Sequence, residues 1–193
     1  MCVACYKQIM DIHGHHAAVC SVSGDRVKRH NALRDCFHEF CSNAAWGPVK
    51  EKPFLLPFSS ERPADIFVPN FSGRKGLVVD FACTCPIQQK YVRPASQTVS
   101  FTCNKYAQEA KYDIYENRVQ FEGHLYLPIV FESFGGMSDD AVDFVKKMLQ
   151  SVSTRINENK VLVSKLFYEQ VSCILMRSIA KSLISRFPEF AMA

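Results

Sequence analysis

Residues 62–82 read RPADIFVPNFSGRKGLVVDFA, and this stretch decides the fold. Its apolar runs at 65–68 and 77–82 are separated by turn-forming residues, which is typical of neighbouring strands. Asp65 opens the first run and Asp80 lies inside the second. A carboxylate in an apolar strand is costly to bury unless it binds a cation or accepts hydrogen bonds. The two acids therefore predict a Mg²⁺ site that could activate a water molecule beside a phosphodiester.

Hydrophobic spacing on either side of this stretch predicts the remaining elements. Leu33, Phe37 and Phe40 recur at helical spacing and indicate an amphipathic helix from Asp25 to about Cys41. The other expected elements are a strand at 54–57, a helix at 98–117, a strand at 124–131, a helix from the N-cap Ser138 to about Ser153, and a final helix from Lys160 to about Arg186 that Pro188 ends. This order predicts an α/β domain with a central mixed sheet flanked by helices.

Composition restricts the class of protein only loosely. A chain of 193 residues with 48% hydrophobic residues has the size of one domain with a small appendage, and its net charge of +4 weakly favours a polyanionic partner. We expect no membrane span and no signal peptide, and hence a reducing compartment. In such a compartment, close-set cysteines and histidines bind metal more often than they form disulfides.

The first 20 residues hold a set of metal-ligand types. Cys2 and Cys5 are followed by His16 and Cys20, a spacing that predicts a closed, structural Zn²⁺ site. His13 and His15 are rival ligands to His16. We expect this short segment to have no hydrophobic core of its own, so a metal is the expected source of its stability.

The two acids and a downstream helix resemble a nuclease family. Asp65 and Asp80 are spaced as in the PD-(D/E)XK superfamily, although Ala82 stands where that family has lysine. The helix at 98–117 offers Lys111 and Tyr115, which resemble the Lys-x-x-Lys-Tyr pattern of the restriction-like endonucleases of eukaryotic non-LTR retrotransposons. Ile114 replaces the second lysine of that pattern.

Further short motifs extend this resemblance over roughly residues 2–136. They are Gly14 to Ala17 with Cys20, Arg29 to Asn31, Lys50 with Glu51, and Pro128 to Glu132 with Gly135. The resemblance implies a zinc knuckle at 1–24, a restriction-like endonuclease core at 25–136, and C-terminal helices at 137–193 that pack on the core or extend it.

The resemblance also implies an activity and a place for it. We expect an endonuclease that uses Mg²⁺ or Mn²⁺ to nick or cleave double-stranded DNA in the nucleus, as in target-primed retrotransposition. A reverse transcriptase domain and the element's RNA are the expected partners. Two alternatives remain open: a catalytically inactive or domesticated binding module with the same fold, and an RNA or DNA-repair nuclease of the same superfamily.

Each candidate residue has an expected role. Asp65 and Asp80 would bind the divalent metal, and Lys111, within about 8 Å of them, would neutralise the phosphorane or orient the attacking water. Glu51 is a candidate third ligand and Tyr115 a candidate phosphate contact. The residues expected to contact DNA are Arg26, Lys28, Arg29 and Arg34 on the first helix, with Arg62 and Lys105.

Overall fold

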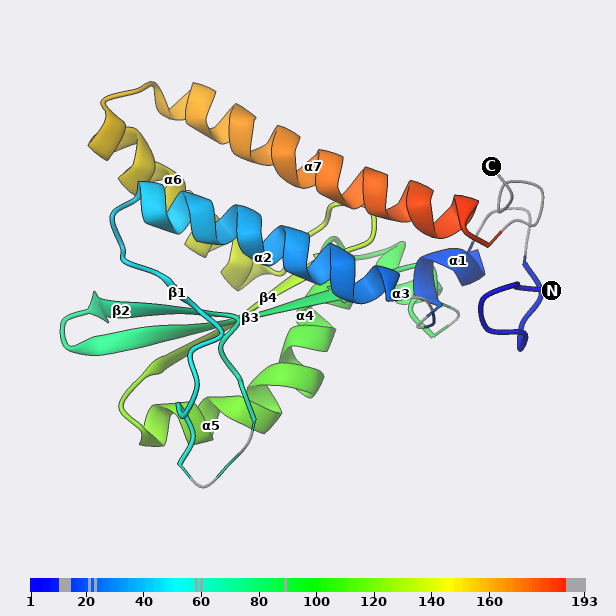
Figure 1. Ribbon diagram of the computed structural model, residues 1–193, viewed down its shortest axis with the longest axis horizontal. Helices are drawn as coiled ribbons and strands as arrows, with labels where there is room; N and C mark the ends of the chain where they lie inside the picture. The colour runs from blue at the N-terminus through cyan, green and yellow to red at the C-terminus, as the bar shows by residue number, and fades with distance from the viewer. Residues whose placement is uncertain are drawn as a thin grey trace.

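The computed structural model describes residues 1–10, 15–20, 22, 24–57, 59, 61–88 and 90–186, and in them the chain forms a mixed four-stranded sheet between two layers of helices (Figure 1). The strands are β1 (Val49–Lys50), β2 (Ile66–Ser72), β3 (Lys75–Thr84) and β4 (Leu125–Glu132). The helices are α1 (His15–Val19), α2 (Asp25–Asn43), α3 (Val92–Ala95), α4 (Phe101–Ala107), the π-helical turn η1 (Gln108–Tyr112), α5 (Asp113–Phe121), α6 (Asp139–Ile156) and α7 (Lys160–Ile184). The expected α/β architecture is confirmed.

The sheet has the order β1-β2-β3-β4, with β3 at its centre. β2 and β3 form an antiparallel hairpin closed by Gly73 and Arg74, and Gly73 adopts the positive φ of +62° that such a tight turn requires. β3 and β4 are parallel and pair from Leu77 to Thr84 on the β3 side. Because β2 pairs with β3 only from Leu77 to Val79 and again at the turn, the second half of β3 lacks a β2 neighbour.

The larger core lies on the sheet face that α2, α6 and α7 cover (Figure 1). Phe37 of α2 packs edge-to-face against Phe81, Phe131 and Phe167, which come from β3, β4 and α7. All four rings are buried, so elements that are far apart in the sequence pack together on this face. α6 therefore packs on the sheet, and α7 packs on α2 and α6 as part of the same core.

The second sheet face is covered by the continuous helical segment from α4 through η1 to α5 (Figure 1). Ala82 and Val130 pack under α4 with Cys103, and Tyr126 packs under α5 with Val119. The segment matches the helix expected at 98–117, but its η1 turn was not expected. A π-helical turn widens the helix locally and so changes the direction in which its side chains point.

The strand expected at 54–57 is wrong. Residues 54–57 form bends and turns, Phe54 has a φ of +59° and is 90% exposed, and prolines flank the segment. Leu55 and Leu56 are nevertheless buried against Val78 of β3, so their apolar character reflects a loop packed on the sheet. The edge strand is instead the two-residue β1.

The expected boundaries of the other elements lie within a few residues of the observed ones. α2 continues to Asn43 and α6 to Ile156, while α7 ends at Ile184. Pro188, expected to stop the last helix, lies outside the described residues. Ser138 is the N-cap of α6, although its side chain forms no capping hydrogen bond. Among the helices that the structure describes, none has the length and apolar character to cross a bilayer.

Candidate functional site

Asp65 stands at the point where β2 parts from β3. Its backbone N–H donates to the Val79 carbonyl at 3.0 Å, and its Oδ2 accepts from the Phe81 backbone N–H at 2.6 Å. The carboxylate thus satisfies a β3 amide that has no strand partner there. The Asp65 Oδ1 lies 3.0 Å from Nε2 of His30 on α2. Asp65 therefore lies at the sheet edge, in contact with the helix layer on one side.

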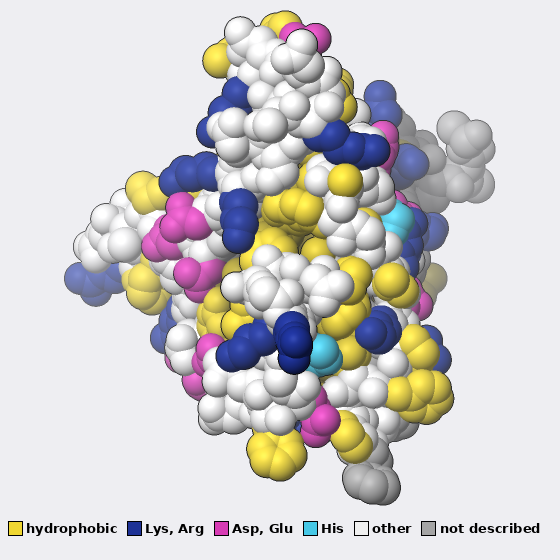
Figure 2. Space-filling model, turned by 90° about the vertical axis from the view of Figure 1, so that its left-hand side faces the viewer, with side chains coloured by type: hydrophobic (Ala, Val, Ile, Leu, Met, Phe, Trp, Pro, Cys, Tyr) yellow, Lys and Arg dark blue, Asp and Glu magenta, His cyan; other side chains and the backbone are white. Residues whose placement is uncertain are grey.

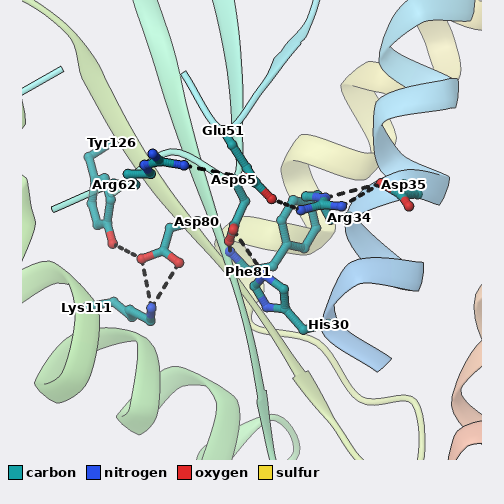
Figure 3. Close-up of polar contacts among 10 residues, drawn as sticks. All are labelled: His30, Arg34, Asp35, Glu51, Arg62, Asp65, Asp80, Phe81, Lys111 and Tyr126. Atoms are coloured by element: carbon teal, nitrogen blue, oxygen red, sulfur yellow. Dashed lines mark hydrogen bonds and ion pairs between the residues drawn. The ribbon is translucent and has the colours of Figure 1, made fainter. Parts of the chain in front are cut away.

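Asp80 presents its carboxylate to the other helix layer (Figure 3). The Lys111 ammonium, supplied by η1, donates to Oδ1 at 2.9 Å and to Oδ2 at 2.8 Å. The Tyr126 hydroxyl of β4 donates to Oδ2 at 2.8 Å. Asp80 is only 7% exposed, so this carboxylate is buried among a cation and a hydroxyl donor rather than in water.

Burial affects the pKa values of both Asp80 and Lys111. Desolvation raises the pKa of Asp80, and the nearby Asp65 charge adds to the increase, against the opposing effects of Lys111 and Tyr126. Desolvation lowers the pKa of Lys111, but the attraction and hydrogen bonds of Asp80 outweigh it and leave the Lys111 pKa raised. The two carboxylates are thus close enough to repel each other, and a second cation would relieve that repulsion.

A cleft of about 520 Å³ opens beside the pair. It runs between α2 and η1, over the part of β3 that β2 leaves uncovered. Lys111 and His30 line the cleft from opposite helix layers, and Ala82 forms part of its floor. The small Ala82 side chain is 7% exposed and leaves the cleft without the strand lysine of the nuclease pattern. The Lys111 ammonium enters from η1 instead and reaches the same side of β3 as Ala82.

Glu51 lies directly after β1 and is held by cations of its own. Arg34 of α2 donates to its Oε1, and the Arg62 guanidinium lies 3.9 Å from its Oε2. Figure 3 shows the Glu51 carboxylate directed toward Arg34 and away from the Asp80 carboxylate. The structure therefore brings Glu51 to the rim of the site without a contact to Asp65 or Asp80 among the interactions of the described residues.

Two further candidates lie farther from the carboxylates. Tyr115 of α5 packs with its ring 6.0 Å from the ring of Tyr126, so it supports the residue that bonds Asp80. Lys105 of α4 lies 3.6 Å from Glu109 in an exposed ion pair. Lys105 therefore faces solvent and takes no part in the Asp80–Lys111 contact.

The basic face expected on α2 is only half exposed. Arg26 and Lys28 are exposed, but Arg29 is 4% exposed and Arg34 is 9% exposed. This burial does not fit a solvent-facing basic surface: Arg29 lines a pocket with Thr84 and Gln88, and Arg34 contacts Asp35 and Glu51. Figure 2 shows the end of the molecule that lies on the left in Figure 1. There, lysines and arginines are interspersed with acidic and apolar side chains, without a continuous basic surface.

Sequence reasoning missed Tyr126 as a site residue. Tyr126 is the partner of Val78 in the parallel register, so it lies on the same sheet face as Asp80. The alternation of β4 could have identified that face, but not the hydrogen bond. His30, which lies within the Arg29 to Asn31 motif, is bonded to Asp65.

A second cluster lies at the N-terminus. The ligand atoms of Cys2, Cys5, His16 and Cys20 all lie within 4.8 Å of one another, which suits a tetrahedral ion such as zinc with Zn–S bonds of about 2.3 Å. Cys5 Sγ is 3.3 Å from His16 Nε2, and hydrogen bonds from the Lys7 backbone are the largest influence that lowers the Cys5 pKa, to about 6. His13 and the side chain of His15 lie outside what the structure describes, and His16 is the histidine of the described cluster.

No protein-family model matches the chain, and a search of curated proteins finds no relative. The functional argument therefore depends on the geometry of the site itself.

Proposed function

We propose that this protein is a metal-dependent nuclease that cuts DNA. The observation that carries the proposal is the bidentate contact of Lys111 with Asp80, beside Asp65, at the edge of an open cleft. These three residues come from separate elements, and a buried acid pair with one lysine costs stability that a simple apolar core would not. Ionisable groups whose burial is unfavourable are common at functional sites.

The donor set fits a divalent cation. Asp65 and Asp80 offer carboxylate oxygens, the ligands that Mg²⁺ and Mn²⁺ prefer, and a bound cation would oppose the burial and the Asp65 charge that raise the Asp80 pKa. When bound, Mg²⁺ would supply Lewis-acid polarisation of the phosphate and a more acidic water. Glu51 is a weaker candidate ligand because Arg34 engages it.

The protein's own residues then have distinct tasks. Lys111 balances the Asp80 charge and places an ammonium at the cleft, where it can stabilise negative charge that develops on a phosphate. Tyr126 orients the Asp80 carboxylate, and His30 orients that of Asp65. Arg26 and Lys28 are the exposed cations of α2 that can contact the backbone of a DNA duplex.

Several features of this proposal follow from the family resemblance. They are a restriction-like fold, a zinc knuckle formed by the N-terminal cluster, nicking or cutting of double-stranded DNA, a nuclear location, and a partnership with a reverse transcriptase domain and its RNA. The mixed sheet, with one acid just before β2 and one on β3, supports the first of these features, and the Cys/His cluster supports the second. A repair or RNA nuclease would use the same site on a different substrate, and competition among duplex DNA, branched DNA and RNA separates these.

A nicking assay tests the proposal. Wild-type protein is incubated with supercoiled plasmid and Mg²⁺ or Mn²⁺, beside Asp80→Asn and the matched control Asp143→Asn, whose carboxylate is exposed on α6. We expect wild type and the control to nick and Asp80→Asn to lose at least about 100-fold of the rate, the usual contribution of one such catalytic group. Equal traces for all three proteins would contradict the proposal.

A second candidate function is a binding module without catalysis. It is favoured by the fact that Lys111 and Tyr126 already occupy both Asp80 oxygens. This candidate predicts duplex binding that Mg²⁺ does not change and no nicking by the wild-type protein.

A further inference from the structure

Arg29 of α2 is a buried cation without a carboxylate partner. Its side chain is 4% exposed, and its Nε is buried with no hydrogen-bond partner. Among the described residues, no ion pair joins Arg29 to any acid. A buried charge in this condition is unfavourable for the folded state.

The other buried arginines of the described chain show what is missing. Arg34 contacts both Asp35 and Glu51, and Arg186 contacts Asp25 at 2.6 Å. Each of them therefore has a negative charge in reach, as buried guanidinium groups usually do. Arg29 instead faces the Cys83 thiol, and burial raises the pKa of that thiol, so it stays neutral and supplies no counter-charge. An anion from outside the chain could supply that charge.

Arg29 lines a pocket of about 180 Å³ that can receive such an anion. Arg26 adds a second guanidinium to the lining, while Thr84, Gln88, Tyr106 and Ser133 add uncharged polar groups, and no carboxylate lines it. Two cations and several neutral donors form a suitable environment for a phosphate, because guanidinium groups bind phosphate oxygens in pairs.

The pocket is continuous with the cleft of the nuclease site. Arg26, Cys83 and Tyr106 line both. Cys83 lies three residues after Asp80 on β3, which is roughly 10 Å at about 3.3 Å per residue.

We propose that the Arg29 pocket binds a backbone phosphate of the DNA strand, close to the phosphate that faces Asp80 and Lys111. The inference rests on the proposed nuclease function for the identity of the ligand, but the pocket itself is argued from Arg29 alone. The buried arginine would fix the register of the strand in the cleft, whereas the exposed Arg26 and Lys28 would contact it without fixing it.

The first experiment examines the pocket without DNA. Thermal melts of wild type, Arg29→Gln, Arg29→Lys and the control Arg74→Gln, an exposed arginine in the β2–β3 turn, are recorded with sodium phosphate and with sodium chloride of equal ionic strength. We expect phosphate to raise the melting temperature of wild type and Arg74→Gln, to raise that of Arg29→Lys less, and to leave Arg29→Gln unchanged.

The melts in chloride alone distinguish a ligand-binding role from a structural one. Loss of an unpaired buried charge should leave the Arg29→Gln melting temperature equal to or above that of wild type. A lower melting temperature for Arg29→Gln, together with no phosphate effect on wild type, would overturn the proposal.

The second experiment measures DNA binding in an Asp80→Asn background, which removes cleavage from the readout. The slope of log affinity against log salt should decrease in magnitude by about 0.9 when Arg29→Gln is added, the value for one duplex phosphate contact. An unchanged slope would overturn the assignment to a DNA phosphate. If wild type fails to nick but phosphate still stabilises it through Arg29, the nuclease proposal fails and the phosphate pocket stands.

Discussion

At the residue scale, Asp80 and Lys111 form a largely buried ion pair, in which the two side chains are 10% and 18% exposed. Removal of one member would leave the other buried without its counter-charge. Lys111→Met should therefore lower the free energy of unfolding by roughly 3 kcal/mol, the usual cost of breaking a buried pair. Urea denaturation measures this change.

Two further variants check the cause of that loss. Asp80→Asn combined with Lys111→Met should recover most of the lost stability, because neither buried charge remains. Lys105→Met, which breaks only the exposed pair with Glu109, should stay within about 0.5 kcal/mol of wild type. Additive losses in the double variant would show that Lys111 stabilises the protein independently of Asp80.

The sequence predicts the acids of the site better than their partners. A carboxylate in an apolar strand stands out because its burial is costly, so Asp65 and Asp80 could be identified from local pattern alone. Lys111 required the family resemblance, since a lysine on an amphipathic helix is common. Tyr126 and the burial of Arg29 depend on contacts between distant segments, and no local pattern encodes those contacts.

At the element scale, the η1 turn positions Lys111. Helical spacing predicts a helix over this segment but does not distinguish a π turn, because one extra residue hardly changes the apolar pattern. The edge strand was missed for a related reason: Leu55 and Leu56 are apolar and buried as a strand would be, yet they pack from a loop. Long, strongly periodic elements such as α7 were predicted almost to their ends.

Deletion of Glu109 tests whether η1 serves the site. The deletion removes the extra residue of the π turn and should give a regular α-helix from α4 into α5, with an unchanged or higher melting temperature. The direction of Lys111 would change, and plasmid nicking should fall by at least about 100-fold. Deletion of Glu122, at the exposed end of α5, is the control. Full nicking activity without Glu109 would show that η1 does not matter for catalysis.

At the scale of the whole molecule, the N-terminal cluster and the last helix meet. α1 packs against α7, and buried Arg186, just after α7, donates to Asp25 and to the Val22 carbonyl at 2.8 Å. The segment that carries Cys20 is thus connected to both α2 and α7. A metal in the cluster should therefore stabilise the whole protein and not only its first residues.

Removal of zinc tests this connection. A chelator selective for zinc over Mg²⁺, or the variant Cys5→Ser, should lower the melting temperature by at least about 2–4 °C, the shift for roughly 1 kcal/mol in a chain of this length. Colorimetric assay should find one zinc per chain in wild type and in the control Cys173→Ser, an exposed thiol on α7 outside the cluster. A wild-type protein that contains no zinc would contradict the assignment.

Arg186 gives a sharper test of the same connection, because it follows α7 and contacts Asp25 at the start of α2. Arg186→Met removes the buried guanidinium that contacts Asp25 and should cost roughly 3 kcal/mol in the zinc-loaded protein, whereas Arg177→Met, exposed on α7, should cost little. In a Cys5→Ser background the N-terminal segment is already loosened, so Arg186→Met should cost clearly less. Equal costs in both backgrounds, measured by urea denaturation, would mean that the metal cluster and the C-terminal helix contribute to stability independently.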